Sequence, residues 1–169
     1  APAGIVGYMA AVAKIAGFAA LARILITALG DLSNTWVPMV AGLAALSMLV
    51  GSVLALVQGD VRRMLAYSGV AHAGFIMTGV VAGSFQGVLF YLAVYAIQLV
   101  GAFAVVAAVS GSDAAKSSIN RYRGLARRSP GLAASFTLLL LGMAGLPLTS
   151  GFVAKFGVFA DAWASGVEW

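Results

Sequence analysis

The chain has 169 residues, of which 62% are hydrophobic and only 9% are charged, whereas roughly 25% of the residues of a soluble domain are charged. This composition excludes a water-soluble globular domain and predicts an integral membrane protein. With no cysteine, one histidine and five acidic residues, the sequence excludes a disulfide framework and thiolate-bound iron–sulfur clusters, and it argues against a haem or a multi-histidine metal site.

Five apolar stretches are long enough to cross a bilayer, which takes about 17 to 25 residues of helix. They cover residues 5–29, 36–57, 64–81, 88–109 and 132–164. The last stretch is longer than the others and is interrupted. Residues typical of turns separate the stretches, and no alternating strand pattern competes with them. The sequence therefore predicts an all-α, polytopic transmembrane helix bundle of about five spans, with residues 1–169 forming a single membrane domain.

The basic residues lie in two loops between these spans. Arg62 and Arg63 separate the second span from the third, and a loop with Lys116 at its start and Arg128 at its end separates the fourth from the fifth. By the positive-inside rule, both loops are expected on the cytoplasmic side. Because the charge gathers in loops and not along one helix face, the net charge of +5 reflects membrane topology, and no nucleic-acid partner is expected.

In the first span, Lys14 lies about nine residues from the start, or roughly 14 Å along a helix. A lysine side chain cannot comfortably reach the interface from that depth, so we interpret it as a titratable amine that faces the protein interior. Two alternatives remain open at this point. The lysine could be paired with a carboxylate, or the span could begin elsewhere and place the amine at the interface.

In the third span, His72 is the only histidine of the chain. Ser68 precedes it by four residues, so the hydroxyl and the imidazole lie on one helix face and could share a hydrogen bond or a water molecule. Histidine titrates near neutral pH and suits a proton relay inside a membrane, with Tyr67 as a further polar neighbour. The alternative is a hydrogen-bonded histidine with a purely structural role.

In the fourth span, Tyr91, Tyr95 and Gln98 share a helical face by their spacing. They could line a chain of water molecules within the bundle. Aromatic residues at this spacing are more often packing residues, and that alternative also stays open.

The fifth span contains the most informative stretch of the sequence. Its apolar run is broken by three residues: Gly145, Pro147 and Gly151. Lys155 follows the break within about one helical turn, and Thr149 and Ser150 lie beside it. Irregular backbone at membrane depth requires polar partners or water, so this combination predicts a hydrated ion pathway. An ordinary proline kink, with a lysine that reaches the interface, is the alternative.

Several of these pieces resemble the antiporter-like membrane subunits of respiratory complex I, the NADH–quinone oxidoreductases. The resemblance rests on ALVQGDVRRMLAYS at 55–68, AHAGF at 71–75, GAF at 101–103, YRGL at 122–125 and AGLPLTSGFVAKF at 144–156. It covers essentially the whole chain. It implies helices eight to twelve of a fourteen-helix subunit, so that the chain is a fragment of a larger one.

The resemblance also implies roles for the titratable residues. Lys14 matches the central lysine of the eighth helix in that family, His72 the histidine of the tenth and Lys155 the lysine of the discontinuous twelfth. It implies a proton route through these three residues, driven by quinone reduction in partner subunits of a bacterial inner membrane. No cofactor is expected in this chain itself. FMN, iron–sulfur clusters and quinone are implied in the partners, which include further antiporter-like subunits.

Two other functions are compatible with the sequence. One is a subunit of a multi-chain cation/proton antiporter, which shares the fold but has no redox arm. The other is a structural membrane subunit without a transport role. In the leading interpretation the chain belongs to an enzyme complex but performs no redox chemistry of its own.

Overall fold

The structure is a computed structural model that describes residues 3–110 and 118–166; Lys116, at the start of the second basic loop, lies outside these ranges. The described elements are α1 (Ala3–Arg23), a π-helical turn η1 (Ile24–Ala28), a 3-10 turn η2 (Gly30–Leu32), α2 (Ser33–Leu56), α3 (Val61–Val81), α4 (Phe85–Ser110), a 3-10 turn η4 (Ile119–Tyr122), α5 (Leu125–Arg128), α6 (Pro130–Ala144) and α7 (Ser150–Ala164).

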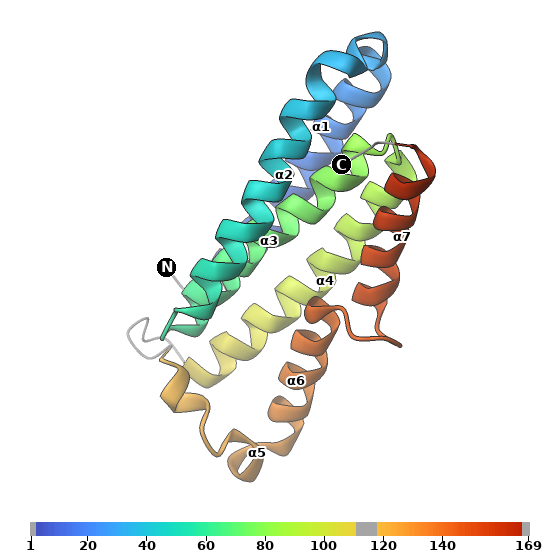
Figure 1. Cartoon of the computed structure of the whole chain (residues 1–169). Helices are drawn as coiled ribbons and strands as arrows, with labels where there is room; N and C mark the ends of the chain where they lie inside the picture. The colour runs from blue at the N-terminus through green and yellow to red at the C-terminus, as the bar shows by residue number, and fades with distance from the viewer. Residues whose placement is uncertain (1–2, 111–117, 167–169) are drawn as a thin grey trace.

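The helices form a bundle in which α4 is the central element (Figure 1). α2 packs along α3 and α1 packs along α4, while α6 and α7 lie one after the other against α4. Four stretches of helix are long and apolar enough to cross a membrane: Gly7–Ala28, Gly30–Leu56, Val61–Val81 and Phe85–Ser110. The fifth span consists of two helices of 15 residues each, α6 and α7. The predicted all-helical membrane bundle with a discontinuous last span is thus confirmed.

Three of the long helices begin three residues earlier than the apolar pattern predicts. α2 starts at Ser33, α3 at Val61 and α4 at Phe85. At the start of α3, the Asp60 side chain accepts a hydrogen bond of 3.1 Å from the backbone N–H of Arg63, as an N-cap residue does. Hydropathy marks where a helix enters the apolar layer, whereas the helix itself extends over polar residues to its cap.

The break between α6 and α7 is closed by a cap on each side. Gly145 adopts a left-handed conformation with φ 82°, and the N–H groups of Gly145 and Leu146 bond to the carbonyls of Gly142 and Leu141. This is the Schellman arrangement, which favours glycine because φ is positive. On the other side, the Thr149 hydroxyl accepts a hydrogen bond of 3.3 Å from the N–H of Phe152.

The predicted limits of the break need one correction. The irregular segment covers residues 145–149, because Ser150 and Gly151 already belong to the first turn of α7. Thr149 caps α7 by accepting a hydrogen bond from Phe152, three residues further on. The helix therefore begins at Ser150, and Gly151 is its second residue.

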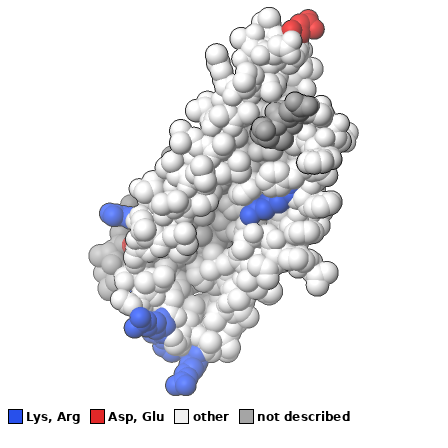
Figure 2. Space-filling model, viewed as in Figure 1, with Lys and Arg blue, Asp and Glu red and all other residues white. Residues whose placement is uncertain are grey.

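Both basic segments meet at the same end of the bundle. The N–H of Ile119 donates to the carbonyl of Gly59 at 3.0 Å, which joins the loop before α3 to the segment before α5. Figure 2 shows that basic groups gather at one end of the molecule, that an acidic group marks the other end, and that one basic group lies midway within uncharged surface. The geometry is compatible with one membrane side for both loops, and their cytoplasmic placement stays a prediction.

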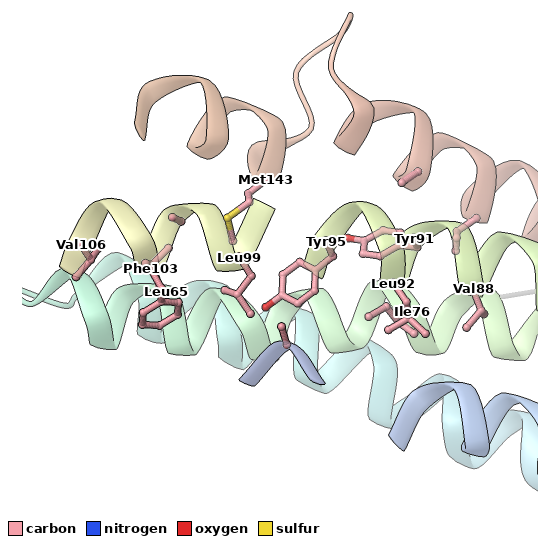
Figure 3. Close-up of a cluster of buried hydrophobic side chains, with 14 of the residues drawn as sticks. Leu65, Ile76, Val88, Tyr91, Leu92, Tyr95, Leu99, Phe103, Val106 and Met143 are labelled. Atoms are coloured by element: carbon pink, nitrogen blue, oxygen red, sulfur yellow. The ribbon is translucent and has the colours of Figure 1, made fainter. Parts of the chain in front are cut away.

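The core of the bundle lies between α3 and α4. Buried apolar side chains of these two helices include Leu65, Ile76, Leu92 and Leu99, and Figure 3 shows them together with Tyr91 and Tyr95 of α4 and Met143 of α6. The outer helices α1 and α2 bury few of their side chains. The polar side chains that this core encloses are therefore the candidates for function.

Candidate functional site

Lys14 extends from α1 toward the interface between α3 and α4. Its Nζ donates hydrogen bonds to the Gly69 carbonyl at 2.8 Å and to the Tyr95 hydroxyl at 3.2 Å. The amine fits because Gly69 has no side chain: a Cβ at that position would lie 2.4 Å from Nζ. The amine of Lys14 thus points into the protein, and its described hydrogen bonds are to uncharged oxygens.

His72 lies on α3 and is buried against α4. Its Nδ1 is 2.8 Å from the hydroxyl of Tyr91, and its ring lies 4.6 Å, centroid to centroid, from that of Tyr95. Of the two possibilities for Ser68 and His72, a direct hydrogen bond is not formed: the Ser68 hydroxyl donates to the Leu65 carbonyl of its own helix at 3.0 Å, and a shared water molecule stays a prediction. The imidazole therefore bonds across to α4 and not along α3.

The predicted polar face of α4 connects the surrounding helices. Tyr95 touches both Lys14 and His72, and Tyr91 bonds to His72. Three residues beyond Tyr95, the buried Gln98 donates from Nε2 to the Ser150 hydroxyl of α7 at 3.2 Å. The three side chains share one face, as their spacing predicts, and each of them makes a polar contact with another helix.

Lys155 reaches back across the break from α7 to the end of α6. Its Nζ donates to the carbonyls of Met143 at 2.9 Å and of Ala144 at 3.0 Å, and it lies 4.7 Å from the ring centroid of Phe75. The last carbonyls of a helix have no partner within the helix and carry the negative end of its dipole. The amine is therefore held by the carboxyl-terminal end of α6 and by an aromatic face.

Two hollows reach these groups. A small cavity of about 10 Å³, close to the size needed for a single water molecule, lies where α3, α4 and α7 meet and is lined by His72, Tyr95, Gln98 and Lys155. A larger groove of about 580 Å³ runs between α2, α3 and α6, and its walls include Ser68, His72 and Lys155. Histidine and Lys155 thus border the same two spaces although their side chains come from different helices.

The remaining candidates have local roles. Tyr67 is half-buried on α3, and its backbone carbonyl faces α2 at Gly51. Thr149 caps α7 and donates from its hydroxyl to the Leu146 carbonyl at 2.6 Å. Ser150 joins the site through Gln98. Tyr95 of α4 therefore links Lys14 with His72, whereas Lys155 meets His72 at the small cavity and over the ring of Phe75. Tyr67 and Ser68 lie outside the hydrogen-bonded set.

Sequence reasoning did not find several of the partners. It placed Tyr91 on the right face but did not assign it to His72, and it did not single out Gly69 or the carbonyl ends of α6. Nothing in a single sequence identifies a backbone carbonyl as a partner, because the rotation of one helix against another decides it. The spacing of Tyr91, Tyr95 and Gln98 was the one signal that pointed to α4.

The chemistry of this arrangement suits proton transfer. Across residues 3–110 and 118–166, no group of three or more His, Cys, Asp or Glu side chains is placed to hold a metal ion. The two amines and the imidazole are bonded to neutral oxygens that can also bind water. Groups of this kind, linked by hydroxyls and a water-sized cavity, can pass a proton between helices.

Comparison with known proteins gives consistent matches over the whole chain. Residues 1–169 match the family model described as NADH:quinone oxidoreductase/Mrp antiporter, TM. NADH-quinone oxidoreductase subunit N of Rhodococcus opacus (strain B4) is 50% identical over 169 residues, which cover 98% of this chain and 31% of the relative. The protein of the same name from Mycobacterium tuberculosis (strain ATCC 25618 / H37Rv) is 46% identical over 173 residues, which cover 98% of this chain and 33% of the relative.

A solved structure shares the fold. A chain of respiratory complex I from Thermus thermophilus with bound aureothin superimposes with a TM-score of 0.71 at 37% sequence identity, and the match covers 77% of this chain and 30% of that chain. The chain studied here spans about a third of the length of the relatives it matches.

Proposed function

The chain belongs to the NADH:quinone oxidoreductase/Mrp antiporter family of membrane proteins, and on that premise we propose that it is part of a proton-translocating membrane subunit of complex I. Lys14, His72 and Lys155 carry the proton in this proposal. Quinone reduction in partner subunits, which hold FMN, iron–sulfur clusters and quinone, supplies the energy. The partners are other membrane subunits, including further antiporter-like ones, in the bacterial inner membrane with both basic loops in the cytoplasm.

One observation carries the proposal: two lysines from different helices turn their amines inward onto neutral oxygens, with a buried histidine between them. Lys14 and His72 share Tyr95 as a neighbour, and His72 and Lys155 border the same small cavity. An amine at the centre of a membrane helix costs about 2.5 to 3.5 kcal/mol on insertion scales. The described hydrogen bonds of both amines are to neutral oxygens and not to a carboxylate, so neither amine is fixed in its charged form by a permanent counter-ion.

The mechanism follows from these contacts. A change at a neighbouring subunit alters the hydration of the groove and of the cavity beside Lys155, and a proton moves from Lys14 through His72 toward Lys155. Two positive charges in one poorly hydrated region repel each other, so the arrival of one proton favours the release of another. Tyr91 and Tyr95 hold the imidazole in place and offer hydroxyls for the transfer.

The test is Lys155→Gln in the full-length subunit, assembled with its partners in membrane vesicles. We expect NADH oxidation to persist, assembly to stay near normal and the number of protons moved per electron to fall. Arg127→Gln serves as the matched control, because it removes an exposed cation from the loop region instead. An unchanged proton-to-electron ratio in the assembled Lys155 variant would count heavily against the proposal.

A second function shares the fold, and the family description itself favours considering it. The family includes Mrp antiporters, so the chain could belong to a multi-chain cation/proton antiporter without a redox arm. Sodium-dependent transport in the absence of NADH-driven quinone reduction would support that function. A purely structural membrane subunit would tolerate the neutralisation of both Lys14 and Lys155, so the double variant tests that alternative.

A further inference from the structure

Gln98 occupies the point at which α4 meets both halves of the broken helix. Its side chain is buried, and its Nε2 donates to the Ser150 hydroxyl in the first turn of α7. The same nitrogen lies so close to α6 that a Cβ added at Gly142 would be 2.7 Å from it. One amide therefore touches the end of α6 and the start of α7 together.

The two half-helices approach each other closely beneath this amide. A Cβ at Gly151 would lie 1.8 Å from the backbone carbonyl oxygen of Gly142. Glycine at 151 permits this approach, since a Cβ there would clash with the α6 backbone, whereas a Cβ at Gly142 would clash with the Gln98 amide. We call this contact between Gly142 and Gly151 the seam.

The seam determines where the amine of Lys155 lies. Lys155 follows Gly151 by four residues, so the two lie on the same face of α7, about 6 Å apart along its axis. The amine then spans the break to the carbonyls of Met143 and Ala144, one and two residues beyond Gly142. Sliding or opening of the seam by 1 Å would therefore change both of these hydrogen bonds by a similar amount.

The seam is made of glycine backbone and has no side chain of its own to hold it. Among the described residues, the side-chain hydrogen bonds that run from α7 to α6 are those of Lys155, and the Gln98–Ser150 bond ties the start of α7 to α4 beside the seam. If Lys155 lost its charge during transport, its own hold on α6 would weaken. The Gln98–Ser150 bond does not depend on that charge.

Resting on the proposed function, we infer that Gln98 is a positioning residue for Lys155. Its amide holds the first turn of α7 against the last turn of α6 and so keeps the amine on the carbonyl end of α6 through the proton cycle. Gln98 acts through Ser150 and the seam, and it does not itself carry the proton. Because Gln98 and Tyr95 lie on the same face of α4, the Gln98–Ser150 bond also connects the start of α7 to the helix that contacts Lys14 and His72.

The test uses the full-length subunit in the assembled complex, in membrane vesicles. Gln98→Leu removes the amide and keeps most of the volume, and Ser150→Ala removes its partner. Ser150→Thr keeps a hydroxyl at that position and should rescue the bond. Gln86→Leu is the matched control, because Gln86 is an exposed glutamine at the start of the same helix, α4.

We expect Gln98→Leu and Ser150→Ala each to lower proton transport per NADH oxidised by about threefold or more, because the net contribution of one hydrogen bond corresponds to a change of this size. The double variant should be no worse than either single variant, because both remove the same contact. The pH at which transport is half-maximal should also move toward lower pH, since carbonyl oxygens favour the charged amine. Gln86→Leu and Ser150→Thr should match the unsubstituted protein in all three measurements.

Two results would overturn the inference. The first is transport and a pH profile in assembled Gln98→Leu and Ser150→Ala that equal those of Gln86→Leu. The second is a double variant whose losses add, which would show two independent contacts. If Gln98→Leu fails to assemble, Ser150→Ala decides the matter alone, because it removes one partly exposed hydroxyl. Unchanged transport in Lys155→Gln would refute the proposed function. Loss of transport in Lys155→Gln together with normal transport in Ser150→Ala would refute only the positioning role of Gln98.

Discussion

A methyl group at position 69 should displace the amine of Lys14. The Cβ of Gly69→Ala would lie 2.4 Å from the Nζ of Lys14 and 2.8 Å from the hydroxyl of Tyr95. An ordinary contact requires 3.4 Å or more, so the amine must move about 1 Å away from the new methyl group. The Tyr95 hydroxyl is displaced by the same group. The Lys14–Tyr95 hydrogen bond of 3.2 Å is already at the long end of the normal range.

We expect this substitution to break at least one of the two hydrogen bonds of the amine. A hydrogen bond to a charged group contributes about 1.5 to 3 kcal/mol, so the amine should occupy its present position roughly tenfold to a hundredfold less often. The helix itself should tolerate alanine, which is a better helix former than glycine. The damage is therefore expected in transport and not in folding.

The assay is proton transport per NADH oxidised in vesicles that contain the assembled complex. Gly17→Ala is the matched control, because it lies on α1 one turn beyond Lys14 and a Cβ there meets nothing within 4 Å. Gly69→Ser adds the same Cβ but supplies a hydroxyl to replace the lost partner, so it should retain more transport than Gly69→Ala. If Gly69→Ala transports protons as well as Gly17→Ala at equal assembly, the inward placement of the Lys14 amine has no role in transport.

Two further substitutions test other contacts of the site. Tyr91→Phe leaves Nδ1 of the buried His72 without its hydroxyl partner, at a cost of about 1 to 3 kcal/mol, and should slow proton transport severalfold. Tyr8→Phe, at an exposed position, is the control and should leave transport unchanged. Equal transport rates of the two variants in vesicles would contradict the relay role of the histidine. Gly151→Ala places a methyl group 1.8 Å from a backbone carbonyl of α6 and should lower the amount of subunit retained in the membrane, measured by quantitative immunoblotting. Gly157→Ala is the control, because a Cβ there meets nothing within 4 Å. Normal accumulation of Gly151→Ala would show that α6 and α7 can separate at the break.

Local chemistry made the broken helix predictable from the sequence. Gly145 is needed where the backbone turns left-handed after α6, and Thr149 is a preferred first cap for α7. Both preferences depend on a few neighbouring residues, so they can be read in a single chain. The resemblance to the antiporter-like subunits rests on this same stretch, and the comparisons confirm the family.

The partners of the titratable groups could not be predicted in the same way. The histidine bonds to Tyr91, nineteen residues away, and not to Ser68 on its own helix, because Ser68 finds a carbonyl acceptor one turn earlier. A hydroxyl in a helix can always bond to such a carbonyl, so sharing a face does not ensure that two side chains bond. Which residue fills the space across a helix interface depends on rotation and depth, and these are properties of packing.

The contacts of α4 indicate how three titratable groups on separate helices could respond to one signal. Lys14 belongs to α1, His72 to α3 and Lys155 to α7, and one face of α4 contacts the first two directly, through Tyr95 and Tyr91, and reaches the start of α7 through the Gln98–Ser150 bond. Energetic coupling between distant sites requires an element whose arrangement both sites influence. A displacement of α4 by about 1 Å would lengthen the Lys14–Tyr95 bond beyond hydrogen-bonding distance and strain the seam in the same movement. The amines on α1 and α7 therefore need no direct contact for a movement of α4 to affect both, because it acts on Lys14 through Tyr95 and on the start of α7, four to five residues before Lys155, through Gln98 and Ser150.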